Sequence, residues 1–243
     1  MNTTAHACYA FLIYNLIYWL WFGVYPPGVL CLFSVLFGIA PDLDYIYWKL
    51  VKKRDLDQTF QHHLIFWTHF PLSYIPAVII FIISIFLNFF PEFFLSLVVG
   101  LYSHMVFDSM ACGDGLQWAR LPWRKTQYCR FVNLFADRVG TDGYHGGYYS
   151  ARYRKTIFFK IENGAALFSI FLNIMYTFWS DQIISYIFLI VTFMVMMLIG
   201  LKKPDPKYLQ EPPGGRYSDY RQNPEYIEYF RKKIETKETG TKD

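Results

Sequence analysis

The sequence predicts an all-α fold, a polytopic membrane helix bundle of about six transmembrane segments with both termini in the cytosol. Hydrophobic residues make up 54% of the chain and charged residues only 17%, whereas soluble domains carry about 25% charged residues. The hydrophobic residues are clustered in long segments that contain no Glu or Lys. All Lys and Arg residues lie outside these segments, as expected of a chain that crosses a membrane several times.

Six apolar segments give the predicted helices: 7–22, 29–40, 64–90, 93–107, 165–179 and 183–201. A helix needs about 20 residues to cross the hydrocarbon core, so the third and sixth segments are long enough by themselves. The first, fourth and fifth reach this length when polar flanking residues are included. The second is short, and we expect a half-helix or a re-entrant segment supported by its neighbours.

The basic residues predict the orientation. All Lys and Arg residues lie in three segments: 49–54, 120–160 and 202–242. Six crossings place these segments on one side, which the positive-inside rule assigns to the cytosol. The expected location is the plasma (inner) membrane. We expect the basic loop to contact anionic lipid headgroups among the membrane lipids. Nucleic acid is not expected as a partner, because acidic residues are interspersed.

The predicted organisation is a transmembrane domain over 1–201, a cytosolic insertion within it at 109–160, and a polar cytosolic tail at 202–243. The insertion is long for a connector. It is expected either to lie on the membrane surface or to pack on the bundle as a loop. Prolines at the start of the tail end the last helix, and a short helix is expected from Pro224. The four cysteines form no C-x-x-C pair and are expected to be reduced and structural.

The candidate functional residues gather at one end of the predicted helices. They are His6, Asp42, Asp44, His62, His63, His69, His104 and Asp108. Ionisable groups at a membrane boundary are costly to bury, so their convergence from several segments indicates a functional site. The remaining histidine, His145, lies in a glycine-rich stretch and is expected to be a loop residue.

His104 and Asp108 are four residues apart in the fourth segment. On a helix they share a face and lie about 6 Å apart along the axis. They could ligate one metal, or Asp108 could orient the imidazole. The structural alternative is a neutral His104 that makes one hydrogen bond.

Asp42 and Asp44 follow Pro41 at the end of the second segment. Either could cap a short helix. As a pair opposite histidines, they are better explained by metal binding or a general-base role.

His62, His63 and His69 precede the third apolar segment. On a helix, His62 and His69 would share a face and His63 would point elsewhere. A kink at Pro71 would then turn His69 inward, and Thr68 could hold a ligand in place. His6 is expected in the first turn of the first helix, after a Thr cap.

These motifs together resemble the LexA-regulated inner-membrane metal-dependent hydrolases. The resemblance covers residues 3–123 and is carried by these residues: Thr4/His6, Pro41-Asp42-Leu43-Asp44, His62/His63 with Thr68-His69, and Ser103-His104 with Asp108. The Arg that follows the first His in that family is replaced by His63 or Leu64, so either His62 or His63 could be the counterpart. The resemblance implies a hydrolase whose divalent metal is bound by His and Asp.

Mixed imidazole and carboxylate ligands suit zinc, manganese or iron, with zinc or manganese expected here. Such a metal lowers the pKa of bound water towards about 7 and polarises a phosphoryl or carbonyl oxygen. Because the candidate ligands exceed one tetrahedral set, two metals could bind.

The expected function is hydrolysis of an ester or phosphoester, such as that of a lipid headgroup, at the cytosolic leaflet. The expected metal ligands are His6, His69, His104 and Asp108, completed by His62 or His63. Asp42 and Asp44 would divide metal binding and general-base catalysis. The alternatives are a divalent-cation transporter and a non-enzymatic scaffold with a structural metal site.

Overall fold

The computed structural model describes residues 2–51, 66–111, 117–120, 128–130, 151 and 153–203 of the 243-residue chain. The chain divides into two compact units. The first unit comprises Met1–Asp42, Ser73–Phe107 and Arg154–Lys203. The second contains the described residues outside these ranges.

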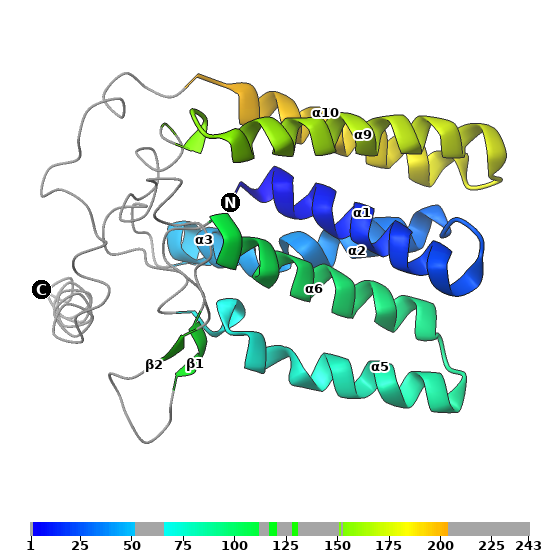
Figure 1. Ribbon diagram of the computed structural model, residues 1–243, viewed down its shortest axis with the longest axis horizontal. Coiled ribbons are helices and arrows are strands. Elements are labelled where there is room, and N and C mark those ends of the chain that lie inside the picture. Colours follow the sequence, from blue (N-terminus) through cyan, green and yellow to red (C-terminus); the bar gives the residue numbers. More distant parts are fainter. Residues whose placement is uncertain are drawn as a thin grey trace, which may run out of the picture. The chain divides into compact units, whose positions relative to one another are not determined.

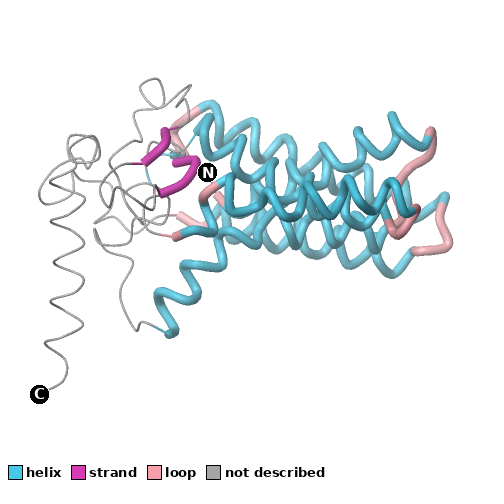
Figure 2. The backbone as a smooth tube through the Cα atoms, turned by 90° about the horizontal axis from the view of Figure 1, so that it is seen from below, coloured by secondary structure: helices cyan, strands magenta, loops and turns pink. Residues whose placement is uncertain are grey.

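The first unit is a bundle of helices that lie side by side with their axes aligned (Figures 1 and 2). These helices are α1 (Thr3–Phe22), α2 (Gly28–Ile39), α5 (Ile75–Leu87), α6 (Pro91–Ala111, of which the first unit includes the part up to Phe107), α9 (Ile157–Trp179) and α10 (Ile183–Leu201). They form three helical hairpins, α1–α2, α5–α6 and α9–α10, whose short connections lie together at one end (Figure 1). The start of α1 lies at the opposite end.

α1 forms the centre of the first unit, where it contacts α2, α9 and α10. Its Phe11 and Tyr14 side chains are fully buried. Phe11 meets Phe193 of α10 edge-on, with 5.3 Å between the ring centroids, which is a preferred arrangement of aromatic rings. The Tyr14 hydroxyl donates a hydrogen bond to the carbonyl oxygen of Glu92 in α6 at 3.1 Å. Other helices therefore hold α1 on several sides.

α2 approaches α1 and α6 so closely that only glycine fits at two positions. A Cβ added at Gly38 would lie 2.4 Å from the Cβ of Ala10 and 3.0 Å from the carbonyl oxygen of His6. A Cβ added at Gly100 of α6 would lie 2.6 Å from the Cβ of Phe37 and 2.9 Å from the nitrogen of Gly38. Small residues let membrane helices pack backbone to backbone. These two glycines therefore set the spacing of the three helices.

The outward faces of the bundle carry large apolar side chains. Phe86 of α5 is 84% exposed and Ile184 of α10 is 85% exposed, as expected where lipid covers the surface. Three helical stretches are long and apolar enough to cross a membrane: Gly28–Val51, Ile157–Trp179 and Ile183–Leu201. Their length and composition indicate a membrane protein.

The second apolar segment is longer than the half-helix or re-entrant segment that the sequence predicts. α2 continues through a 3₁₀ turn (η1, Ala40–Leu43), a turn of α-helix (α3, Asp44–Ile46) and a π-helical turn (η2, Tyr47–Val51). The helical stretch Gly28–Val51 is therefore 24 residues long. Proline has no N–H and its ring disrupts regular helix, so Pro41 gives the chain an irregular turn without ending it.

The third apolar segment does not form one long helix, so its predicted extent over 64–90 is wrong. His69 lies in a 3₁₀ turn, η3 (Trp67–His69), and a second 3₁₀ turn, η4 (Pro71–Tyr74), precedes α5. α5 ends at Leu87, and its C-cap residue Asn88 takes the left-handed conformation (φ 48°). The continuous helical stretch Pro71–Leu87 is thus short for a span.

The described part of the second unit contains an antiparallel pair of strands, β1 (Gln117–Arg120) and β2 (Tyr128–Arg130). They lie within the predicted insertion and are the exception among otherwise helical described elements. The rings of Tyr47 and Trp48 meet Phe66 edge-on, at 6.2 Å and 5.9 Å between centroids. Most of the predicted insertion, the expected helix from Pro224 and His145 lie outside the described residues.

The close helix contacts predict opposite effects of two Gly→Ala substitutions. Gly100→Ala should destabilise the protein by about 1–3 kcal/mol, because its Cβ would overlap α2. Gly164→Ala on α9 is the matched control, since its Cβ would meet nothing within 4 Å. That control should stabilise the helix by about 0.5–1 kcal/mol. Thermal unfolding of both variants in detergent would measure the difference, and equal stability would contradict the packing described above.

Candidate metal centre

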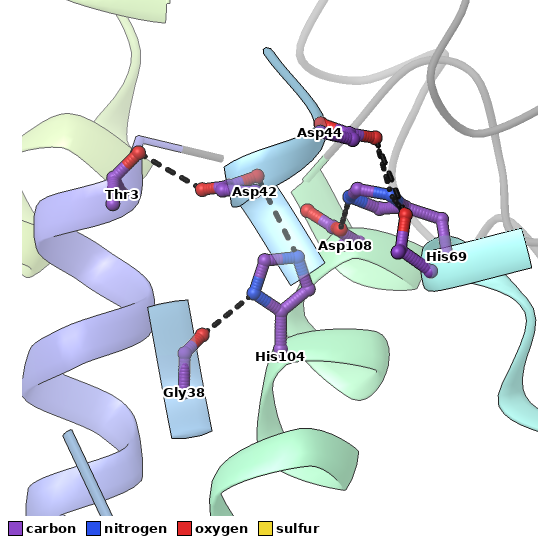
Figure 3. Close-up of polar contacts among 8 residues, drawn as sticks. Thr3, Gly38, Asp42, Asp44, His69, His104 and Asp108 are labelled. Carbon is purple, nitrogen blue, oxygen red and sulfur yellow. Dashed lines mark hydrogen bonds and ion pairs between the residues drawn. The ribbon is translucent and has the colours of Figure 1, made fainter. Parts of the chain in front are cut away.

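A backbone carbonyl fixes the tautomer of His104. This residue is fully buried on α6, and its Nδ1 lies 2.7 Å from the carbonyl oxygen of Gly38 (Figure 3). A carbonyl oxygen can only accept a hydrogen bond, so Nδ1 carries the proton. In the neutral imidazole, the lone pair is therefore on Nε2. Metal-binding histidines are commonly oriented in this way by a carbonyl behind the ring.

Asp42 faces the other nitrogen of the His104 ring. Its Oδ1 lies 3.7 Å from Nε2 of His104. Its Oδ2 accepts a hydrogen bond of 2.9 Å from the hydroxyl of Thr3, in the first turn of α1 (Figure 3). Asp42 is 8% exposed. One carboxylate oxygen is thus held by α1 while the other faces the imidazole.

His6 completes this group from α1. It is fully buried, and its ring stacks on that of His104 with 3.7 Å between centroids and 19° between planes. Two protonated imidazoles stacked this closely would repel each other in a medium of low dielectric constant. A neutral imidazole is the form that binds metal ions.

His6, Asp42 and His104 can together hold a metal ion. Each offers one ligand atom, and these atoms lie within 4.8 Å of one another. The donors are two imidazole nitrogens and a carboxylate oxygen, a set that suits zinc and other first-row divalent metals. We call these three residues the metal cluster.

The second unit contains another buried His and Asp group, which we call the His69 group. Nδ1 of His69 lies 3.1 Å from Oδ2 of Asp44, and Nε2 of His69 lies 4.0 Å from Oδ2 of Asp108. The hydroxyl of Thr68 lies 3.4 Å from the same Asp44 oxygen and 3.3 Å from Nδ1 of His69. Asp44 and Thr68 therefore hold one edge of the ring, while the opposite nitrogen faces Asp108 (Figure 3).

The Asp-x-Asp spacing explains why the two carboxylates have different partners. Residues two apart on an α-helix point about 200° apart, and in a 3₁₀ turn they point about 240° apart. Asp42 lies in the 3₁₀ turn and Asp44 begins the next helical turn. Both are buried, whereas Leu43 between them is 49% exposed. Of the two acids predicted to divide metal binding and general-base catalysis, Asp42 thus belongs to the metal cluster and Asp44 to the His69 group.

The structure brings six of the eight predicted site residues into these two groups. His6, Asp42 and His104 form one, and Asp44, His69 and Asp108 form the other. α6 supplies a residue to each group, because His104 and Asp108 are four residues apart on it. His62 and His63 lie outside the described residues.

The predicted Thr cap of α1 is wrong. Asn2 is the N-cap residue, and its side chain makes no capping hydrogen bond. The Thr3 hydroxyl donates to Asp42, and the Thr4 hydroxyl donates to the carbonyl oxygen of Met196 at 3.2 Å. The sequence also offers Asp42 as a helix cap, but its carboxylate accepts the hydrogen bond of Thr3 from another helix.

Sequence reasoning missed Thr3, Gly38 and Glu162. Glu162 is 2% exposed and lies in α9. The predicted segment begins only at residue 165, because the charged residues at the start of α9 resemble those of the preceding loop. A signal was present, because the N-cap residue Thr156 starts the helix by accepting a hydrogen bond from the Phe159 N–H at 3.5 Å. Recognising Thr156 as the N-cap would have placed Glu162 within the predicted helix.

No family model, curated protein or solved structure matches this chain. The resemblance to the inner-membrane hydrolases therefore rests on its own motif residues.

Changing one ligand of the metal cluster should abolish tight metal binding. Asp42→Asn keeps the side-chain volume but removes the charge, and we expect zinc affinity to fall by more than about tenfold, since losing even an outer-shell partner has that effect. Isothermal titration of the purified protein with zinc chloride would measure it. Asp181→Asn changes an exposed acid and should leave the affinity unchanged. Equal affinity of both variants and the wild type would exclude Asp42 as a ligand.

Proposed function

We propose that this protein is a membrane-embedded metal-dependent hydrolase that acts on an ester or phosphoester bond, related to the family that its motifs resemble. The observation that carries the proposal is the buried metal cluster, in which the Gly38 carbonyl directs the lone pair of His104 Nε2 towards Asp42. A buried, oriented set of nitrogen and oxygen donors is costly to maintain unless it binds something.

Zinc or manganese is the proposed ion, because the cluster offers nitrogen and oxygen donors and no sulfur. His6, Asp42 and His104 would hold it. A divalent ion there would polarise a phosphoryl or carbonyl oxygen and make a bound water more acidic. Thr3 holds the Asp42 carboxylate and Gly38 holds the His104 ring, so both ligands are oriented before an ion arrives.

Within the His69 group, His69 is the residue that can accept a proton. An ionised Asp44 can only accept hydrogen bonds, so it fixes the proton of His69 on Nδ1 and leaves Nε2 basic. Asp44 and Asp108 would also stabilise the imidazolium that forms when Nε2 takes a proton. A carboxylate behind a catalytic histidine has this role in many hydrolases. This assignment moves His69 from the expected metal ligands to proton transfer.

The headgroup region of the cytosolic leaflet is the proposed location of the substrate. His104 lies seven residues before the end of α6 at Ala111, which corresponds to about 10 Å along the axis. His6 lies in the first turns of α1. Ligands near helix ends suit a lipid phosphoester, whereas transporter sites are usually formed near the bilayer midplane. Six crossings and cytosolic termini belong to the same proposal.

The proposal predicts metal-dependent release of lipid headgroups. The purified protein in vesicles of phosphatidylglycerol and phosphatidylethanolamine, supplied with zinc or manganese, should release phosphate-containing headgroups detectable by ³¹P NMR. His69→Ala should lower the rate by about 10²–10⁴-fold, the usual contribution of an acid–base group, while zinc binding persists. Removing the metal with a chelator should stop turnover, and adding it back should restore turnover.

Two other outcomes would replace the proposal. Uptake of zinc or manganese into the vesicles without any headgroup release would indicate a divalent-cation transporter. Zinc binding with neither uptake nor hydrolysis, together with loss of folding in the metal-free protein, would indicate a scaffold with a structural metal site.

The proposed orientation predicts the sides from which engineered thiols react. Asp181→Cys, between α9 and α10, should react with a membrane-impermeant maleimide in intact cells. Lys155→Cys, before α9, should react only after permeabilisation. Both positions are exposed, and native Cys8 and Cys31 are buried. Cys112 and Cys129 would be replaced by Ser in the background. The reverse labelling pattern would indicate the opposite membrane orientation.

A further inference from the structure

The buried side of α9 is polar although the helix is long and apolar enough to cross a membrane. Its buried residues are Glu162, Ala166, Ser169 and Asn173, which follow one stripe along the helix. Ser169 and Asn173 donate to carbonyl oxygens of α9 itself, Ala165 at 2.8 Å and Ser169 at 2.7 Å. These two residues therefore satisfy part of their hydrogen bonding within their own helix. Glu162 reaches a different element.

Glu162 accepts a hydrogen bond from the N-cap residue of α1. The side-chain amide of Asn2 donates to Oε2 of Glu162 at 3.4 Å. Arg154 belongs to the same end of α9, where its guanidinium lies over the Phe159 ring, 5.8 Å from the centroid, and donates to the carbonyl oxygen of Lys202. Partial burial lowers the pKa of Arg154, and the negative charge of Glu162 opposes that shift.

Asn2 connects Glu162 to two residues of the metal cluster. The carbonyl oxygen of Asn2 accepts hydrogen bonds from the N–H groups of Ala5 at 2.9 Å and His6 at 3.4 Å. The next residue, Thr3, donates its hydroxyl to Asp42 at 2.9 Å. Asn2 is thus the point from which both the backbone of His6 and the partner of Asp42 are positioned.

The charge of Glu162 also fits this location. The N-terminal end of a helix carries partial positive charge and unsatisfied N–H groups. α1 has no acidic residue in its first turn, and its N-cap side chain does not cap it. Glu162 of α9 and Asp42 supply carboxylates at this end from other elements, through Asn2 and Thr3 respectively. A buried carboxylate is expensive in a membrane protein, and this position gives it a favourable partner.

We infer that Glu162 is a positioning residue for the metal cluster, acting through Asn2 and the first turn of α1 on His6 and Asp42. The inference rests on the proposed function for its metal, but the Glu162–Asn2 link can be tested without one. Its effect is transmitted by the helix that carries His6 and by the Thr3 hydroxyl.

The experiment compares four variants: Glu162→Leu, Glu162→Gln, Asn173→Leu and Thr3→Val. Glu162→Leu removes the acceptor for Asn2 and should weaken zinc binding about tenfold, the scale of losing an outer-shell partner. Glu162→Gln keeps an acceptor oxygen without the charge and should recover part of that loss. Asn173→Leu changes the same buried stripe of α9 farther from Asn2 and should leave zinc affinity unchanged.

Two further readouts separate positioning from general stability. The absorption spectrum of bound cobalt(II) should change in Glu162→Leu and stay as in the wild type in Asn173→Leu. In the double variant Glu162→Leu/Thr3→Val, the two effects on zinc affinity should be less than additive, because both substitutions act on the position of the Asp42 carboxylate. Unchanged affinity and spectrum in Glu162→Leu, alongside a loss in Thr3→Val, would overturn the inference.

Hydrogen exchange of the amides in 3–11 distinguishes failure of this inference from failure of the proposed function. If the wild type binds no zinc, the proposed function fails. Faster exchange of the first turn in Glu162→Leu than in Asn173→Leu would then still support the link from Glu162 to α1, and equal exchange would overturn it. Should Glu162→Leu not fold, Asn2→Ala removes the donor of the same hydrogen bond and is subject to the same two outcomes.

Discussion

The close approach of three helices at Gly38 is the constraint on which the metal cluster depends. A Cβ added at Gly38 would lie 3.0 Å from the carbonyl oxygen of His6 on α1, and a Cβ added at Gly100 of α6 would lie 2.9 Å from the Gly38 nitrogen. Its carbonyl oxygen accepts the Nδ1 hydrogen of His104. One residue without a side chain thus brings α1, α2 and α6 together and fixes the tautomer of a ligand. A larger residue would separate the two histidines that stack at 3.7 Å.

The irregular helix after Gly38 has a comparable role for the acids. Pro41 interrupts regular hydrogen bonding, and the following residues pass through 3₁₀, α and π turns. Asp42 and Asp44 therefore leave opposite sides of one segment and meet different histidines. A regular α-helix would also direct the two carboxylates to different sides. Across the 3₁₀ turn that contains Pro41 and the first residue after it, both acids are buried and Leu43 between them is exposed.

The chemistry of the site was easier to predict than its geometry. His6, Asp42 and His104 could be found from the sequence because ionisable residues stand out in apolar segments. The role of Gly38 could not be predicted, because it contributes its backbone carbonyl oxygen, a group that every residue type carries. Glu162 was missed because its partner Asn2 is 160 residues away and its neighbours are charged. The helix boundaries around Pro41 and Pro71 were also mistaken, because a proline can end a helix, kink it or only tighten a turn, and packing decides which.

The burial of the metal cluster has a kinetic consequence. His6 and His104 are inaccessible to solvent, and Asp42 is nearly so. An ion cannot diffuse onto such ligands while the surrounding helices stay packed, so loading and release must wait for local opening of the protein. Ion exchange would then be governed by how often the first turn of α1 frays, and a chelator in solution would act at that rate however strongly it binds.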